Sequence, residues 1–225
     1  MITLDFTGKT KLTLRPVEVA SNREISPGIF VLTFRRDFSF IPGQVLAVAM
    51  KPDRQYRFYS IASGMQEQEI RLLFDLKPGG ELTPQLAALQ PGDSFYVSAP
   101  AGNFYGTAKP AVWLAAGTGI APFISMWRSG LRRDKLLVHS GRFLHSFYFE
   151  EDFLPLGKNY IRCCTREQGD GVYHGRINQW IIEQKKLPDN RRYYLCGSAE
   201  MVVDTRDALI EKGVSYENII AEIYF

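Results

Sequence analysis

The pattern of apolar residues changes once along the chain, close to residue 106, and this change limits the folds that the chain can adopt. Before it, short apolar or alternating segments such as GIFVLTFRR and EIRLLFDL are separated by Pro, Gly and Asp turn signals. After it, apolar runs alternate with helical stretches, as where RYYLCG precedes AEMVVDTRDALIEKG. Evenly spaced short strands are typical of a small antiparallel barrel or sandwich, and strand–helix alternation predicts a parallel sheet covered on both faces. We therefore predict two domains, residues 1–106 and residues 107–225.

The same pattern predicts the individual elements. In the first domain we expect strands at residues 11–19, 28–36, 44–51, 56–62, 69–76 and 93–99. In the second we expect strand–helix pairs and a last strand: AVWLAA with APFISMWRSGL, KLLVHSG with the region FYFEEDFLPL, NYIRCC with GRINQWIIEQ, RYYLCG with AEMVVDTRDALIEKG, and finally IIAEIYF.

Composition excludes several classes of protein. With 225 residues, 45% of them hydrophobic and 23% charged, the chain has the composition of a soluble globular protein. It has no run of 18 apolar residues and its first residues lack the features of a signal peptide, so we expect a cytoplasmic protein with no membrane insertion. We also expect a monomer. Cys163, Cys164 and Cys196 form neither a disulfide framework nor a Cys-x-x-Cys site, so no metal is expected. A net charge of +3 is too small to indicate nucleic acid as a partner.

The second domain opens with AVWLAAGTGIAPFI, a strand followed by a glycine pair and a helix start. Gly117 and Gly119, on either side of Thr118, permit the tight turn and close backbone approach that a nucleotide phosphate needs. Pro122 fits the first turn of a helix. The junction departs from G-x-G-x-x-G, and HSGR stands where a dehydrogenase would carry an acid for the ribose, which disfavours an ordinary Rossmann dehydrogenase. A strand–Gly–helix junction also serves plain packing.

The first domain has its own phosphate candidate in PGGELTPQLAAL. We expect Thr83 to cap a short helix over residues 85–89, with Pro84 at its first position. Gly79 and Gly80 would let a pyrophosphate approach exposed amides. The segment can equally be a helical plug that closes the bottom of a barrel, and the two interpretations do not exclude each other.

Taken in order, these segments resemble the ferredoxin–NADP reductase family of flavoproteins, particularly its bacterial flavodoxin/ferredoxin reductase branch. The motifs that carry the resemblance are FIPGQ at 40–44, RFYS at 57–60, GELTPQLAALQPGD at 80–93, GTGIAP at 117–122, HSGR at 139–142, TRE at 165–167, CGS at 196–198 and the ending EIYF. The resemblance implies an antiparallel β-barrel that binds FAD, followed by an α/β parallel-sheet domain that binds NADP(H).

The R-x-Y-S motif implies three contacts to FAD. By resemblance, Arg57 pairs with the pyrophosphate, Tyr59 stacks on the isoalloxazine and Ser60 hydrogen-bonds near flavin N5. A guanidinium fork suits phosphate, a flat ring suits a flat heterocycle, and a hydroxyl can both donate and accept. Tyr59 can instead be an ordinary barrel residue that shares a strand face with Arg57. The flavin-binding set extends to Phe58, Ile61, Gly80, Leu82 and Thr83.

The C-terminus and the CGS motif imply the hydride-transfer site. By resemblance, Tyr224 covers the flavin face where nicotinamide arrives, and Phe225 packs on the adenine of FAD. Cys196, next to Gly197, and Glu222 would lie by the nicotinamide. On sequence alone, IIAEIYF can be simply a last strand with an aromatic end, and Cys196 a small buried apolar residue.

The choice of nicotinamide nucleotide depends on cations, because a 2′-phosphate needs guanidinium forks and hydroxyls. Thr165 and Arg166 match the S-R-E stretch of the NADP(H) branch, and Arg142 and Arg176 stand in matching neighbourhoods. We therefore expect NADPH in preference to NADH, although surface arginines are common and NADH-using relatives keep similar dipeptides.

The resemblance implies an FAD-dependent oxidoreductase that passes electrons between NADPH and a separate one-electron carrier, ferredoxin or flavodoxin. In that interpretation Ser60, Cys196, Glu222 and Tyr224 are the catalytic candidates. Two alternatives stay open: a reductase component of an oxygenase or a free-flavin reductase, and a non-catalytic redox-sensing module that binds flavin or nucleotide.

Overall fold

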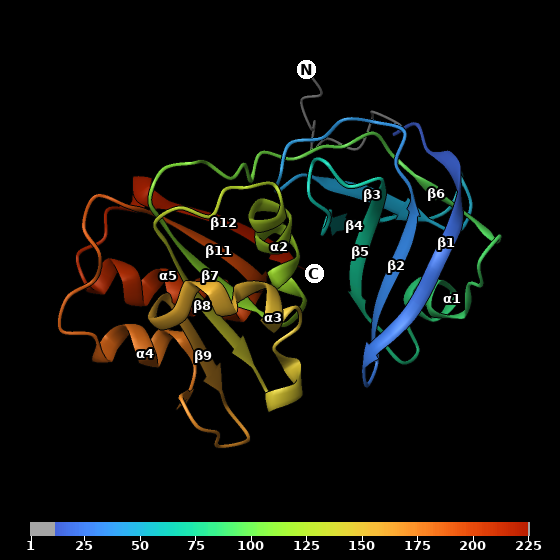
Figure 1. The fold of residues 1–225 in the computed structure, drawn as a ribbon. Helices are drawn as coiled ribbons and strands as arrows, with labels where there is room; N and C mark the ends of the chain where they lie inside the picture. Colours follow the sequence, from blue (N-terminus) through green and yellow to red (C-terminus); the bar gives the residue numbers. More distant parts are fainter. Residues whose placement is uncertain (1–11, 225) are drawn as a thin grey trace. The chain divides into compact units, whose positions relative to one another are not determined.

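The computed structural model describes residues 12–224, and the chain divides between Tyr105 and Gly106 into two compact units. Within the described residues, the first unit is built on an antiparallel sheet of strand order β4-β3-β6-β1-β2-β5 (Figure 1). The second unit is built on a parallel sheet of order β10-β9-β8-β7-β11-β12. The predicted fold class, an antiparallel barrel followed by a parallel α/β domain, is confirmed.

The first unit contains β1 (Arg15–Ser26), β2 (Ile29–Arg35), β3 (Val45–Ala49), β4 (Arg57–Ser60), β5 (Glu69–Asp75), β6 (Ser94–Val97) and the short helix α1 (Thr83–Ala88). The first strand was expected at residues 11–19, and this was wrong, because the strand starts at Arg15 and continues to Ser26. It pairs with β6 along its first residues and with β2 along the rest, with irregular register near Val19. The polar residues of its second half hide the strand from an apolar pattern.

The sheet of the first unit curls until its two ends meet. β4 was expected to continue to residue 62, but it ends at Ser60 because the chain there changes partners. The Ile61 N–H still donates to the Gln44 carbonyl, while Ile61 forms a bridge with Leu72, and the Ala62 N–H donates to the Arg71 carbonyl. This transfer joins β4 to β5 and closes the barrel around a buried apolar core. Members of that core are Val19, Leu32, Phe34, Leu46, Val48, Ile61, Leu72, Phe74, Phe95 and Val97.

Helix α1 forms a plug in this core. Leu86 and Leu89 are buried with the barrel residues, and the Asn22 side-chain amide donates to the carbonyl oxygens of Leu86 (2.9 Å) and Leu89 (3.0 Å). The expected Thr83 cap is wrong: Leu82 precedes the helix with no side-chain cap, and Thr83 Oγ1 accepts from the Lys77 N–H at 2.9 Å. The hydroxyl therefore fixes the preceding turn, and the plug interpretation of this segment is correct.

The second unit contains the strands β7 (Ala111–Ala116), β8 (Lys135–Gly141), β9 (Tyr160–Cys164), β10 (Val172–His174), β11 (Arg192–Ser198) and β12 (Ile219–Tyr224). Its α-helices are α2 (Ala121–Arg128), α3 (Glu150–Phe153), α4 (Ile177–Glu183) and α5 (Ala199–Glu211). Strand β10 was not expected, because three residues give no periodicity. The helix expected in FYFEEDFLPL is limited to α3 and a 3-10 stretch, where Gly157 has non-helical dihedral angles.

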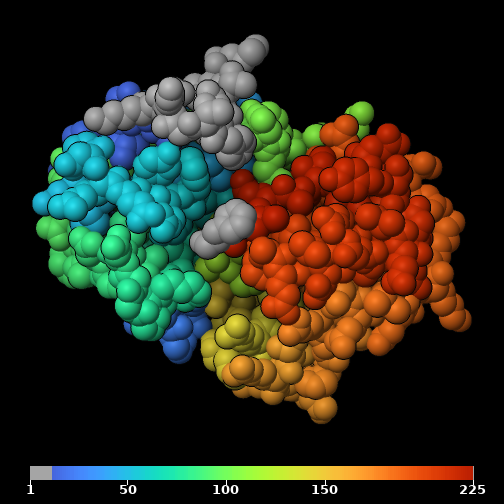
Figure 2. All heavy atoms as spheres, turned by 180° about the vertical axis from the view of Figure 1, so that it is seen from behind, coloured from blue at the N-terminus to red at the C-terminus, as the bar shows by residue number. Residues whose placement is uncertain are grey.

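Both faces of the parallel sheet are covered, as the pattern predicts. On one face α4 and α5 lie side by side, and Ile181 and Leu209 pack in a buried cluster with Leu114. On the other face Trp113 packs against Phe123 of α2, with ring centroids 5.5 Å apart. Figure 2 shows the segment from α4 to β12, in orange to red, as one continuous surface of the second unit. Among the described residues, no helix combines the length and apolar character needed to cross a bilayer.

His139 of β8 is fully buried on the α2 face of the sheet. Its Nδ1 lies 3.1 Å from the Tyr160 hydroxyl, and its ring meets Phe147 edge-on. Its Nε2 has no hydrogen-bond partner among the described residues. Burial lowers the pKa of His139 to about 3, because a charged imidazolium would lose its hydration there.

The burial of His139 predicts a pH-dependent stability. Between pH 6.5 and pH 3 the unfolded chain binds a proton at this residue and the folded chain does not, so stability falls as pH falls through that window. From pH 7.5 to pH 5.0 we expect His139 to account for a loss of about 2 kcal/mol in the free energy of unfolding. Urea unfolding of His139→Leu at both pH values should show a loss smaller by that amount. The exposed His174, changed to Gln, is the control and should keep the wild-type loss; an equal loss in His139→Leu would contradict the account.

Candidate functional site

The carboxyl ends of parallel strands meet at one edge of a sheet, and ligands of open α/β sheets bind at that edge where the strand order reverses. In the second unit the reversal lies at β7. The chain proceeds from β7 through β8 and β9 to β10 in one direction, and then returns to place β11 and β12 on the other side of β7. The edge beside β7 and β11 is therefore the expected location of a ligand site.

The glycine junction lies at this point and its two glycines serve different purposes. Gly117 has a φ of +56°, and a Cβ built on it would meet nothing within 4 Å. A Cβ on Gly119 would lie 2.2 Å from the Cys196 carbonyl oxygen, so this glycine lets the turn pack directly on β11. Thr118 lies between them, and its carbonyl accepts from the Ala121 N–H. Pro122 stands in the first turn of α2, as predicted. Gly117 thus faces open space, and Gly119 is a packing residue.

Cys196, Glu222 and Tyr224 come together beside this junction. Cys196 is paired with Ala115 on one side and with Glu222 on the other, and its Sγ lies 4.0 Å from Glu222 Oε2. Burial, and then the Glu222 charge, raise the pKa of the Cys196 thiol well above its usual value, while a hydrogen bond with the Tyr224 side chain lowers it. The thiol is therefore protonated and is a soft, uncharged contact surface rather than a nucleophile.

The neighbouring residues constrain this group further. A Cβ on Gly197 would lie 2.9 Å from Met201 Cε and 3.2 Å from the Ala116 Cβ, so a side chain there would displace the end of Met201 and crowd Ala116. Phe225, which was expected to reach the adenine of FAD, lies outside the described residues.

A basic group lies further along the same edge. Arg142, Arg166 and Arg176 each follow the end of one strand, β8, β9 and β10 in that order. Backbone hydrogen bonds hold these ends together: the Arg166 N–H donates to the Arg142 carbonyl, and the Thr165 N–H to the Gly141 carbonyl. The structure therefore brings the four predicted residues of this group to one edge.

Two partners of these arginines were missed by sequence reasoning. The Arg166 guanidinium lies over the Phe143 ring, 5.4 Å from its centroid, and Arg176 Nη1 donates to Glu200 Oε1 at 2.6 Å. Glu200 is in the first turn of α5, two residues after the CGS motif. Its position in that helix was predictable, but its partner from a different helix was not.

The R-x-Y-S residues of the first unit differ in exposure. Arg57 and Phe58 are exposed, Tyr59 is half-buried, and Ser60 is buried. Tyr59 meets Phe74 edge-on, with centroids 6.2 Å apart. Burial raises the pKa of Tyr59 to about 12, and the nearby Arg57 charge opposes this rise. Tyr59 therefore packs against the core as a barrel residue and also keeps part of its ring accessible.

The phosphate candidate of the first unit is more constrained than predicted. The Gly80 N–H donates to the Lys77 carbonyl at 2.9 Å, so this amide is engaged within the turn. The turn is further held by Thr83, and Leu82 packs partly against the core. The side chain of Ile61 is fully buried, which leaves only its backbone for any ligand.

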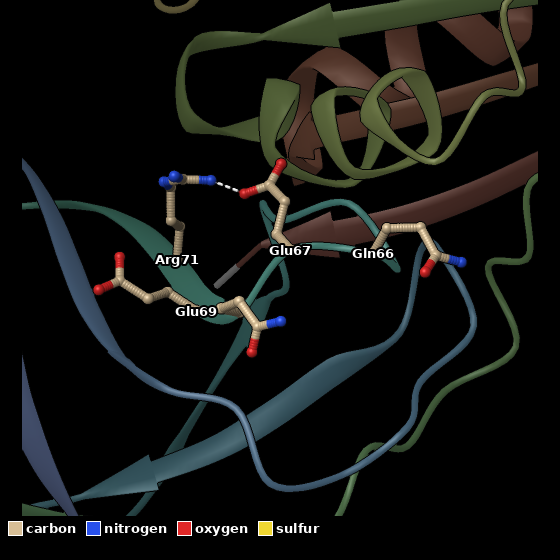
Figure 3. Close-up of a pocket in the computed structure, with 5 residues that line it drawn as sticks. Gln66, Glu67, Glu69 and Arg71 are labelled. Atoms are coloured by element: carbon tan, nitrogen blue, oxygen red, sulfur yellow. Dashed lines mark ion pairs between the residues drawn. The ribbon is translucent and has the colours of Figure 1, made fainter.

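A shallow polar hollow of about 410 Å³ opens at Gln66, Glu67, Gln68, Glu69 and Arg71 (Figure 3). Glu67 and Arg71 point toward each other and form an ion pair, and Glu67 Oε1 also accepts from the Gly64 N–H. The residues that line the hollow are all polar or charged, and none of them is a predicted site residue. We do not assign it a ligand.

The two units match two families of known domains. Residues 16–105 match the oxidoreductase FAD-binding domain, and residues 113–207 match the oxidoreductase NAD-binding domain. Together with the barrel and the parallel sheet, these matches define an oxidoreductase that binds FAD and a nicotinamide nucleotide.

Similar proteins identify the family of oxidoreductases to which the chain belongs. The flavodoxin/ferredoxin–NADP reductase of Escherichia coli K12 is 31% identical over 193 residues, which cover 74% of this chain and 77% of that protein. The chain belongs to the ferredoxin–NADP reductase family. The toluate 1,2-dioxygenase electron transfer component of Pseudomonas putida is 26% identical over 236 residues, which cover 95% of this chain and 68% of that protein. A crystal structure of a ferredoxin NADP+ reductase from Neisseria gonorrhoeae has the same fold, with a TM-score of 0.85, 21% identity and coverage of 96% of this chain and 100% of that one.

The glycine junction generates a stability prediction. Gly119→Ala should cost about 3 kcal/mol or more, because its Cβ would collide with the Cys196 carbonyl, a backbone atom that cannot move without shifting β11. Gly117→Ala is the matched control and should cost about 1 kcal/mol, since only its left-handed conformation opposes a side chain. Urea unfolding of the nucleotide-free protein measures both, and a Gly119→Ala variant no less stable than Gly117→Ala would contradict the packing role.

Proposed function

We propose that this chain transfers electrons between NADPH and a one-electron carrier protein, ferredoxin or flavodoxin, through FAD. The observation that carries the proposal is the group of three arginines that follow the carboxyl ends of β8, β9 and β10, in a chain that also has a flavin-binding unit. Guanidinium forks next to a hydroxyl suit a 2′-phosphate, which distinguishes NADPH from NADH. The similarity to the E. coli flavodoxin/ferredoxin–NADP reductase supports the carrier.

The residues of the first unit fit FAD in their chemistry. Arg57 is exposed and forms no ion pair among residues 12–224, and its guanidinium donates to the Tyr56 carbonyl and the Gln55 side-chain oxygen, so the contacts that a pyrophosphate would replace are with neutral groups. The accessible part of the Tyr59 ring would lie against the isoalloxazine. Ser60 would stand near N5, with Phe58 and the Ile61 backbone beside it. Gly80, Leu82 and Thr83 would shape the turn next to the pyrophosphate rather than bind it through a free Gly80 amide.

The second unit fits a nicotinamide nucleotide. Gly117 leaves space in the turn that precedes α2, where a phosphate would approach the backbone of Gly117 and Thr118. Arg142, Thr165 and Arg166 would surround the 2′-phosphate, with Arg176 at the side. Gly119 and Gly197 would act indirectly, by letting the turn and α5 pack closely on β11.

The transfer itself rests on a few side chains. Bound FAD supplies the chemistry, because it takes up two electrons as hydride and releases them singly. Cys196, protonated and buried, would give the nicotinamide ring a close contact without a competing charge. Glu222 would assist beside the nicotinamide through hydrogen bonds. Tyr224 would occupy the nicotinamide position until the nucleotide displaces it. Ser60 would donate to or accept from N5.

A second candidate function is a reductase component of an oxygenase. The match to the toluate 1,2-dioxygenase electron transfer component covers 95% of this chain, and the shared fold does not distinguish the electron acceptors. The acceptor therefore has to be determined by experiment.

NADPH oxidation should be followed with purified flavodoxin, ferredoxin or free FMN as acceptor, using FAD-loaded protein. We expect kcat/KM to be at least about tenfold higher for one of the two carrier proteins than for FMN, because a docked carrier gains proximity that free flavin lacks. A preference for FMN would indicate a free-flavin reductase. Reduction of FAD by NADPH with slow transfer to every acceptor would favour an oxygenase component with its own partner.

The role proposed for Arg166 predicts that its removal impairs the use of NADPH but not of NADH. Arg166→Ala should raise KM for NADPH about tenfold or more and leave KM for NADH within about twofold, because a charged hydrogen bond to the 2′-phosphate is lost. Arg192, exposed at the amino end of β11, is the matched control, and Arg192→Ala should change neither constant. Steady-state kinetics with both nucleotides measure the effect, and an equal rise for NADH would contradict the assignment.

A further inference from the structure

The basic edge of the second unit contains an acidic residue that was not expected there. Glu200 Oε1 accepts from Arg176 Nη1 at 2.6 Å, and Asp204 Oδ2 lies 3.9 Å from the same nitrogen. The pair joins the start of α4 to the start of α5. The Arg176 side chain is 57% exposed and the Glu200 side chain is 68% exposed, so water and added ligands can reach both.

The local structure does not depend on this pair. The Arg176 N–H donates to Gln179 Oε1, which fixes the start of α4 without its guanidinium. Ser198 caps α5 by accepting from the Met201 N–H, so the Glu200 carboxylate is not needed as a cap. The buried cluster that includes Ile181 and Leu209 already holds the two helices together. An exposed ion pair adds little to that packing.

The carboxylate is, however, well placed to affect an anion. The pKa of Glu200 is lowered by its hydrogen bond and charge interaction with Arg176, and also by the Arg142 charge. Glu200 is therefore a full negative charge among the arginines that we assign to the 2′-phosphate. A phosphate that approaches Arg176 must compete with a carboxylate already bound there.

We propose that Glu200 is a specificity-determining residue of the nucleotide site, whose carboxylate occupies Arg176 and thereby weakens the preference for NADPH over NADH. The inference rests on the proposed function of this edge. NADPH has to displace Glu200 from Arg176 and accept a negative charge close to its 2′-phosphate, whereas NADH has no group at that position and leaves the pair intact. Glu200 would thus reduce the discrimination between NADPH and NADH by weakening the binding of NADPH only.

The test uses adenosine 2′,5′-bisphosphate and adenosine 5′-monophosphate, which differ in the 2′-phosphate alone. Both are titrated into the FAD-loaded protein by calorimetry at low salt, where exposed charges are least screened. Glu200→Gln keeps the shape of the side chain and removes its charge. We expect it to bind the bisphosphate about three- to tenfold more tightly than wild type, with the monophosphate unchanged within about twofold.

Two further variants separate a specific effect from a general one. Asp204→Asn removes a negative charge one turn further along α5 and should give a smaller gain, because its carboxylate lies farther from Arg176. In an Arg176→Ala background, Glu200→Gln should give a smaller gain, since the contact that it releases is absent and only the repulsion between the carboxylate and the phosphate is removed. The kcat/KM ratio of NADPH to NADH should rise in Glu200→Gln in parallel with the binding.

Several results would overturn the inference: an unchanged bisphosphate affinity in Glu200→Gln, equal tightening of both ligands, an equal gain in Asp204→Asn, or a gain that is undiminished without Arg176. These results differ from a failure of the proposed function. A wild-type protein that binds the bisphosphate and the monophosphate equally would contradict the NADPH assignment. The role of Glu200 would still be decided by whether Glu200→Gln binds the bisphosphate more tightly than the monophosphate.

Discussion

The parallel alignment of the strands in the second unit is the constraint on which its candidate site depends. Because all of the strand ends lie at one edge, residues from separate parts of the sequence become neighbours without long loops. Cys196 meets Glu222 only through the pairing of β11 with β12, and Arg142 meets Arg166 only through the pairing of β8 with β9. The missing side chain of Gly119 maintains this arrangement, since it allows the turn after β7 to rest on the Cys196 backbone.

In the first unit the corresponding constraint is the change of partner at the end of β4. Ile61 leaves β3 and bridges to β5, and this closes the barrel. The closure buries Ser60 and leaves Arg57 exposed within four residues of strand. Tyr59 lies between these extremes, packed on Phe74 and still accessible in part.

Much of the fold could be predicted from the sequence because its signals are local. The glycine junction, the proline at the start of α2 and the strand–helix alternation each depend on residues close in sequence. The elements that were missed depend on tertiary contacts. The second half of β1 is polar but is paired on β2, and β10 is too short to show a period.

The residues of the candidate site also divide into those predictable from local sequence and those that depend on tertiary contacts. Arg142, Thr165, Arg166 and Arg176 were predictable through their motifs, and the parallel sheet brings them to one edge. Thr83 looked like a helix cap, but its hydroxyl accepts from the Lys77 N–H of the preceding turn. Glu200 and Phe143 had no motif, because their importance lies in which arginine each one contacts. Local patterns can supply the arginines of a site, but only the folded chain shows what already occupies them.

The most direct test of the central claim is an anaerobic titration of the purified protein with NADPH and, separately, with NADH, while the visible spectrum is recorded. The account predicts a yellow protein whose flavin bands bleach rapidly with NADPH and slowly with NADH. A colourless protein that takes up no added FAD would contradict the account, as would a flavin that NADH reduces as rapidly as NADPH.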